Sequence, residues 1–192
     1  MTKKAIVLLA DGFEEVEAVT PVDYLRRAGV EVTTVSVSGN RTQEGLAVTG
    51  RWTGLKLIAD TALAELIKQG TDSFDAVICH GGMPGAANLA SSKEVSALLK
   101  EMAGAGKLIC AICASPAVVL APLGIIEGKK FTCYPGMEEK VTRANWLNDR
   151  VVSDGNIITS RAAGTTGEWA VEIIKKLLGE ETGNKIAETV LL

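Results

Sequence analysis

Short apolar runs alternate along the chain with segments in which apolar residues recur at helical spacing. Three runs are continuously apolar, as expected for strands buried on both faces of a sheet, and lie at residues 5–9, 76–79 and 108–112. Further strand-like runs lie at residues 31–37, 55–59, 131–133, 151–153 and 156–159. Helical spacing is found at residues 14–28, 60–69, 93–103 and 166–178. This alternation predicts βαβ units and a mostly parallel sheet with helices on both faces.

Three segments depart from this pattern. Pro21 lies inside the helical segment at 14–28 and predicts a kink or an irregular turn there, because proline lacks the N–H donor of a helix. Residues 40–54 are rich in Gly, Thr and polar side chains and predict a loop or hairpin, and residues 186–192 predict a short terminal segment. The chain shows no internal repeat or linker, so we expect its 192 residues to form one domain.

Charge and hydropathy narrow the range of partners. Twenty Lys and Arg residues oppose 23 Asp and Glu residues, and no basic stripe provides the electrostatic footprint of a nucleic-acid-binding protein. No apolar run reaches the length of a membrane span, and the first run stops at Asp11 without the long apolar region and cleavage site of a signal peptide. We therefore expect a cytoplasmic protein that binds neither nucleic acid nor a membrane.

The four cysteines are too few and too scattered for a disulfide scaffold; they are Cys79, Cys110, Cys113 and Cys133. Cys110 and Cys113 have C-x-x-C spacing, but three extended residues separate their Cα atoms by roughly 10 Å. A disulfide requires a separation below about 7 Å, so a dithiol redox site is disfavoured. The chain has a single histidine and no paired ligand motif, which argues against a metal site.

Cys113 is the principal candidate for chemistry. It stands between the apolar run at 108–112 and a helical run that begins near Pro116, with the small residues Ala111 and Ser115 two positions away on either side. This is the layout of a nucleophile elbow, a sharp strand-to-helix turn at which bulky neighbours do not fit. A helix N-terminus directed at the sulfur favours the thiolate. The alternative is a purely structural cysteine, since free cysteine is among the most buried residue types.

Acidic residues follow the first strand, and sites in parallel sheets form beyond the carboxyl ends of strands. Glu14, Glu15 and Glu17 fall in the first turns of the predicted helix, where acids also compensate the helix dipole without any catalytic role. One of the three carboxyl groups is a candidate partner of the cysteine. A buried, protonated glutamate beside a thiolate can donate a hydrogen bond to sulfur.

The turn after the strand at 76–79 offers further candidates. Gly81-Gly82 permits a close backbone approach, so an N–H group there and that of Ala114 can form a pair of oxyanion donors, unless the pair is an ordinary glycine turn. His80 is the only histidine and therefore the only base for a Cys-His dyad, although a structural histidine that caps the strand or bonds to the backbone is the favoured interpretation. No G-x-G-x-x-G fingerprint supports a dinucleotide cofactor.

The chain resembles the ThiJ/PfpI superfamily, in the branch of the parkinsonism-associated deglycase and its bacterial relatives. The resemblance runs in order over nearly the whole chain. It rests on LADGFEEVE at 9–17, PVD and RRAG at 21–23 and 26–29, GG, GA and NL at 81–82, 85–86 and 88–89, AICA at 111–114, and TSR and GT at 159–161 and 164–165.

This resemblance implies a flavodoxin-like three-layer α/β sandwich of the class I glutamine amidotransferase-like type, usually a homodimer, that needs no cofactor. It assigns the nucleophilic, oxidation-prone cysteine to Cys113 and the protonated glutamate to Glu17. It places the oxyanion donors at the N–H groups of Gly82 and Ala114. Arg27 matches an arginine near the dimer interface and the site.

The chain also departs from the pattern of this superfamily. Ala114 replaces the histidine that follows the cysteine in protease-like members, which argues against peptidase activity. Tyr134 replaces a histidine of some close relatives and so removes one possible proton shuttle. His80 stands where relatives often have proline, and Arg51 is the match for a second site arginine.

The resulting hypothesis is a glyoxalase or deglycase whose substrate is a small reactive 2-oxoaldehyde or its adduct on an amine or thiol. The alternative is a redox-responsive stress protein or chaperone without significant turnover, and an amidase is a third possibility. Two structural expectations follow. Cys113 should have strained backbone dihedral angles, and Glu17 rather than Glu15 should lie within hydrogen-bond reach of its sulfur.

Overall fold

A central seven-stranded sheet organises the structure, a computed structural model that describes residues 2–38, 45–52 and 54–192. In spatial order its strands are β10 (Val151–Asp154), β11 (Ile157–Ser160), β7 (Leu108–Ile112), β6 (Ala76–Cys79), β1 (Lys4–Leu9), β2 (Glu31–Ser36) and β5 (Thr61–Ala62). Every neighbouring pair is parallel except β10 and β11. The predicted mostly parallel sheet is therefore confirmed.

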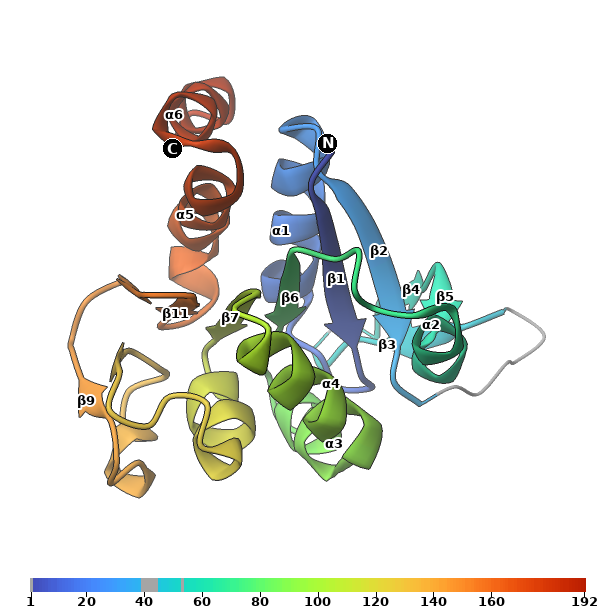
Figure 1. The fold of residues 1–192 in the computed structure, drawn as a ribbon, viewed down its shortest axis with the longest axis horizontal. Helices are drawn as coiled ribbons and strands as arrows, with labels where there is room; N and C mark the ends of the chain where they lie inside the picture. The colour runs from blue at the N-terminus through green and yellow to red at the C-terminus, as the bar shows by residue number, and fades with distance from the viewer. Residues whose placement is uncertain (1, 39–44, 53) are drawn as a thin grey trace.

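Helices cover both faces of this sheet (Figure 1). One face carries α1 (Glu15–Arg27) and α5 (Thr166–Leu178), with α6 (Glu180–Thr189) packed on α5. The other carries α2 (Leu63–Gln69), α3 (Gly85–Ser91) and α4 (Lys93–Gly104). This is the expected flavodoxin-like three-layer α/β sandwich. No helix of the described residues has the length and apolar character needed to cross a bilayer.

The continuous apolar runs of the sequence form the centre of the core. Every residue of β6 and β7 is buried, and β1 is buried from its second residue onward. Strands covered by helices on both faces have no solvent side, which explains why these runs show no polar alternation. The carboxyl ends of these three strands meet at one edge of the sheet, opposite the edge near which both chain termini lie (Figure 1).

Helix α1 differs from its prediction in two ways. It continues as a helix through Pro21, which is buried, rather than forming an irregular turn there. Of its apolar residues, Leu25 is buried, whereas Val16 and Val19 are 49% and 40% exposed. The buried face of α1 contains Glu17 instead, and so brings a carboxyl group into the interior.

Several smaller elements were not predicted or were predicted differently. The chain after Cys113 forms a π-helical turn at Pro116–Leu120 and a 3-10 turn at Ala121–Leu123 rather than a regular helix. Thr61–Ala62 forms the edge strand instead of opening α2, and α6 replaces the expected short terminal segment. The sequence pattern also missed α3 and β9 (Asn145–Trp146), whereas the strand expected at 131–133 is present as the shorter β8 (Lys130–Phe131), which pairs with β9.

The predicted loop or hairpin at residues 40–54 lies partly outside the described residues, which omit 39–44 and 53. Within the described part, β3 (Ala47–Thr49) pairs antiparallel with β4 (Lys56–Ile58). A hairpin is therefore present, and it carries Arg51 and Trp52 at its connection.

Candidate active site

The candidate site lies at the carboxyl edge of the sheet, where the segments that follow β1, β6 and β7 meet. A cavity of about 430 Å³ opens there. It is lined by Glu14, Glu17, Arg51, Trp52, Gly82, Met83, Cys113, Ala114, Tyr134, Met137, Ala162 and Ala163. Most of the residues singled out in the sequence are thus brought together, whereas His80 and Arg27 do not line the cavity.

Cys113 occupies the strained elbow conformation expected of it. Its φ of 62° lies in the left-handed region, which costs a non-glycine residue about 1–3 kcal/mol unless its surroundings enforce it. Two backbone hydrogen bonds do so: the N–H of Cys113 donates to the Ser160 carbonyl at 2.9 Å, and its carbonyl accepts from the Tyr134 N–H at 2.8 Å. The elbow is therefore held between β11 and the segment after β8.

Gly81 provides the space in which the cysteine and the glutamate meet. A Cβ atom at this position would lie 2.5 Å from the Cβ of Cys113 and 2.6 Å from Oε2 of Glu17. No side chain fits there. The glycine that the sequence suggested for backbone approach is thus required for the contact between the two reactive groups.

Glu17 is fully buried and lies beside the Cys113 thiol. Its Oε2 accepts a hydrogen bond from the Gly81 N–H at 2.8 Å, whereas Oε1 is buried and has no hydrogen-bond partner within the described part of the chain. Burial raises the pKa of this carboxyl group to about 7, against the opposing effect of the Gly81 N–H. As expected, Glu17 and not Glu15 faces the sulfur, since the Glu15 carboxylate accepts from the Trp52 N–H.

The surroundings of Cys113 oppose its ionisation, and the thiolate expected at neutral pH stays a prediction. Burial, followed by the negative charge of Glu17, raises the pKa of the Cys113 thiol to about 12, although the N–H groups of Gly82 and Ala114 lower it. Glu17 and Cys113 act on each other and titrate as a coupled pair, so the raised pKa values belong to the pair rather than to either residue alone.

The two proposed oxyanion donors belong to residues that line the cavity beside Cys113. The N–H groups of Gly82 and Ala114 lower the pKa of the Cys113 thiol, as donors directed at a negative charge do. Gly82 has a φ of 81°, and a Cβ atom there would lie 2.7 Å from the Glu14 nitrogen, so the position requires glycine.

His80 holds the site together instead of facing the substrate. Its ring is fully buried, with Nε2 accepting from the Ala10 N–H at 3.2 Å and Nδ1 donating to the Gly81 carbonyl at 2.7 Å. Burial lowers the pKa of the imidazole to about 4, so it is neutral at physiological pH. With both nitrogens engaged, the reading of His80 as a second base is not supported by the geometry. Its own carbonyl accepts from the Ser115 hydroxyl next to the elbow.

Arg51 and Tyr134 line the cavity, whereas Arg27 lies on the surface of the protein. Arg27 pairs with Asp23 at 2.8 Å on the exposed side of α1 and does not reach the cavity of its own chain. Arg51 lines the cavity with its guanidinium 4.3 Å from the centre of the Trp52 ring. Tyr134, which is half-exposed, forms part of the opposite wall.

Trp52 forms one wall of the cavity, a role that was not predicted from the sequence. It is 68% exposed, and its indole N–H donates to Glu14 at 2.9 Å. A tryptophan in a Gly- and Thr-rich polar loop beside an arginine was the available signal, because such a loop offers no core for the ring to enter. Ala162 and Ala163, which also line the cavity, gave no comparable signal.

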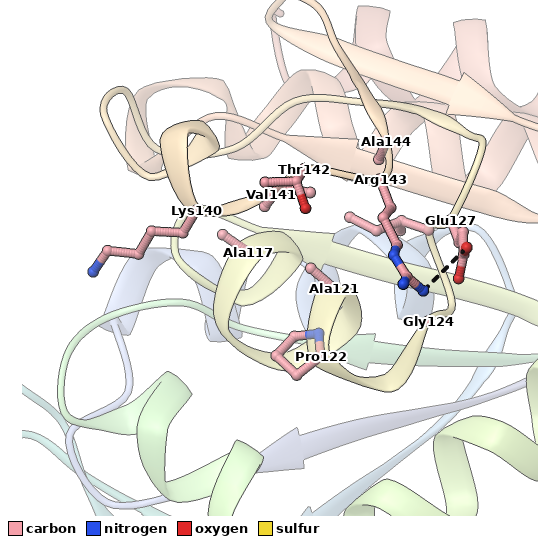
Figure 2. A pocket seen from close by; sticks show the side chains of 11 residues that line it. Ala117, Ala121, Pro122, Gly124, Glu127, Lys140, Val141, Thr142, Arg143 and Ala144 are labelled. Carbon is pink, nitrogen blue, oxygen red and sulfur yellow. Dashed lines mark hydrogen bonds and ion pairs between the residues drawn. The ribbon is translucent and has the colours of Figure 1, made fainter.

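A second cavity of about 240 Å³ lies between the turns at 116–123 and the segment at 140–144 (Figure 2). Arg143 and Glu127, which line this cavity, form an ion pair with 3.4 Å between Nη1 and Oε1. The described residues that line it include no cysteine or histidine. The reactive groups are therefore concentrated at Cys113. In the described ranges of the chain, no cluster of three His, Cys, Asp or Glu residues could hold a metal ion.

Comparison with known proteins gives a consistent result. The model of the DJ-1/PfpI family matches residues 3–176. Protein DJ-1 homolog B of Arabidopsis thaliana is 40% identical over all of this chain, which spans 42% of that protein. Glutathione-independent glyoxalase DJR-1.2 of Caenorhabditis elegans is 34% identical, with 99% of this chain and 97% of that protein covered. The crystal structure of Drosophila melanogaster DJ-1beta superposes with a TM-score of 0.91 at 38% identity, over 100% of this chain and 99% of that one.

Proposed function

The chain belongs to the DJ-1/PfpI family, and from this premise we propose that it is a cysteine-dependent enzyme acting on 2-oxoaldehydes or on their adducts with amines and thiols. The proposal is carried by one observation: a cysteine at positive φ shares a cavity with a buried carboxyl group and two backbone N–H donors. These are a nucleophile, a base and an oxyanion site. A relative named as a glyoxalase supports this choice of chemistry.

In the proposed reaction, the Glu17 carboxylate removes the thiol proton as the Cys113 sulfur attacks the aldehyde carbon. A C–S bond forms, and the N–H groups of Gly82 and Ala114 stabilise the alkoxide until it is protonated. Glu17 then transfers the proton of the former aldehyde carbon to the neighbouring carbonyl carbon. The hydroxyl proton of the thiohemiacetal moves to the neighbouring carbonyl oxygen in the same isomerisation. The carbon bonded to sulfur thus becomes a thioester carbonyl, and the former ketone becomes the 2-hydroxyl group. Water hydrolyses the thioester and restores the thiol.

Lactate release from methylglyoxal tests the proposal. We expect turnover by the wild type, a loss of at least about 100-fold for Cys113→Ser, and a loss of about 100- to 10,000-fold for Glu17→Gln, the range for removal of a general base. Cys133→Ser is the matched control, because it removes another buried thiol outside the cavity and should retain activity. Equal lactate release by wild type and Cys113→Ser contradicts the proposal.

Redox sensing by the same sulfur is the second candidate function. The oxygens of a sulfinate at Cys113 would lie near the N–H groups of Gly82 and Ala114 and near the unpartnered Oε1 of Glu17, an environment that favours the oxidised form. Peptide mass spectrometry after mild peroxide treatment tests it. Oxidation of Cys113 well ahead of Cys110 supports the sensor, whereas similar oxidation of both contradicts it.

We also propose that the protein is a cytoplasmic homodimer. The exposed valines of α1 support the dimer. Val16 and Val19 leave 49% and 40% of their surface open on the same helix as Arg27. Burial of these side chains against a second copy would bring Arg27 to the interface. Light scattering should then show a dimer for the wild type and a monomer for the Val16→Asp, Val19→Asp double variant.

A further inference from the structure

A second hollow adjoins the cavity that contains Cys113. It has a volume of about 470 Å³, and it shares Tyr134 and Ala162 with the first cavity. The two hollows therefore lie side by side at Tyr134 and Ala162, and we refer to them together as the groove. Its far end is lined by Arg150 and Arg161 and, among the described residues, by no acidic side chain.

The guanidinium groups of the two arginines differ in their ion pairs and hydrogen bonds. Arg150 is fully engaged: its Nε lies 2.7 and 2.9 Å from the two carboxylate oxygens of Glu168, and its Nη2 donates to the Gly164 carbonyl at 2.8 Å. Arg161 contributes its backbone N–H to the Arg150 carbonyl. Its guanidinium has no ion pair and no hydrogen bond within residues 2–38, 45–52 and 54–192, although the residue is partly buried. The groove therefore ends at a positive charge that lacks a partner.

Arg161 is also close enough to serve the same ligand as Cys113. The Cys113 N–H donates to the carbonyl of Ser160, the residue before Arg161, at 2.9 Å. Neighbouring strands lie about 4.8 Å apart, so an arginine side chain that starts one residue beyond this contact reaches the far end of a ligand held at the sulfur. Methylglyoxal has only three carbon atoms and cannot occupy both ends of the groove.

We infer that Arg161 binds a carboxylate at the far end of the substrate, so that the preferred substrates are 2-oxoaldehydes carrying an anionic group. A guanidinium presents a planar fork that matches a carboxylate with two parallel hydrogen bonds. The aldehyde then lies at Cys113 and the connecting part of the substrate lies between Tyr134 and Ala162. The inference rests on the chemistry proposed for Cys113, but its anion site can be tested without turnover.

Binding to the Cys113→Ser variant is the primary test. The probes are 4-acetylbenzoate and 4-acetylbenzamide, which have the same shape and differ in charge, titrated by NMR. We expect the benzoate to bind at least about tenfold more tightly, the ratio that a charge-assisted hydrogen bond supplies. Arg161→Met in this background should bring the ratio close to one, and Arg161→Lys should retain part of it. The control Arg143→Met, at the surface of the other cavity, should leave the ratio unchanged. Equal binding of the two probes, or a ratio that survives Arg161→Met, overturns the inference.

Turnover provides the second test, with 4-carboxyphenylglyoxal and its neutral amide as substrates of the otherwise wild-type enzyme. A preference in kcat/KM for the carboxylate, expressed mainly in KM and lost in Arg161→Met, supports the anion site. Should neither compound be turned over while charge-dependent binding persists, the anion site is supported and the proposed reaction is refuted. A preference that is the same in wild type and Arg161→Met overturns the anion site and leaves the reaction standing.

Discussion

Replacing Glu17 by glutamine should make the Cys113 thiol easier to ionise and the enzyme slower. The substitution removes the negative charge beside the sulfur, while its side-chain oxygen can still accept from the Gly81 N–H. Burial continues to raise the pKa of the thiol, and the N–H groups of Gly82 and Ala114 continue to lower it. The charge of Glu17 is the contribution that disappears.

The size of this effect follows from the contact between the two groups. Two unit charges about 4 Å apart interact by about 4 kcal/mol at an effective dielectric constant of about 20. About 1.4 kcal/mol corresponds to one pKa unit, so the pKa of Cys113 should fall by about three. From about 12 in the wild type, it should reach about 9 in Glu17→Gln.

The rate of alkylation of Cys113 by iodoacetamide across pH 6–10, measured by peptide mass spectrometry, reports this pKa. We expect Glu17→Gln to be alkylated about 1,000-fold faster than wild type near pH 8, because the thiolate fraction rises as the pKa falls. Glu15→Gln is the matched control and should follow the wild-type profile, since the Glu15 carboxylate accepts from Trp52 rather than facing the sulfur. Slower alkylation in Glu17→Gln would show that the carboxyl group stabilises the thiolate, and would refute the reasoning.

Three further predictions concern stability. Gly81→Ala should lower the free energy of unfolding by about 3 kcal/mol or more, measured by urea denaturation, because its Cβ would lie 2.5 Å from that of Cys113; a loss below about 0.5 kcal/mol would show that the elbow can relax. His80→Leu should cost about 2–3 kcal/mol by leaving the Ala10 N–H and the Gly81 carbonyl unpaired, and a stability equal to wild type would contradict this positioning role. The native state holds the Glu17 proton up to a pKa of about 7, whereas the ordinary value is 4.5. This carboxyl group therefore stabilises the fold below about pH 4.5, and the stabilisation, about 3 kcal/mol, is lost as pH rises through 7. Chemical denaturation of wild type and Glu17→Gln at several pH values should show this difference in slope, and parallel curves would be inconsistent with a raised pKa.

Local patterns were sufficient to predict much of the fold. The strands β1, β6 and β7 are recognisable because helices cover both of their faces, which leaves no position for polar residues. Helix α5 was predicted with its observed bounds, Thr166–Leu178, because one continuous apolar stripe packs on the sheet. The elbow at Cys113 was predicted for a similar reason, since a sharp strand-to-helix turn restricts its neighbours to small residues.

Other features depend on contacts between distant segments, which a local pattern does not contain. The ionisation of Cys113 is set by burial and by Glu17, 96 residues earlier in the chain, and not by the short π-helical turn that follows the elbow. The helix α6 was missed because it buries few residues, Gly183 and Ile186, and so lacks an apolar stripe. Trp52 was not identified, because a tryptophan in a polar loop does not by itself show which distant segments its ring will face in the cavity.

Rapid-quench peptide mapping during turnover of a 2-oxoaldehyde tests the central claim, that the Cys113 sulfur bonds covalently to the substrate carbon. Wild type should show an adduct on Cys113 that forms and decays at the rate of 2-hydroxy acid release, and Glu17→Gln should convert it to product more slowly. Product release by Cys113→Ser at the wild-type rate, or turnover with no adduct on this cysteine, would contradict the claim.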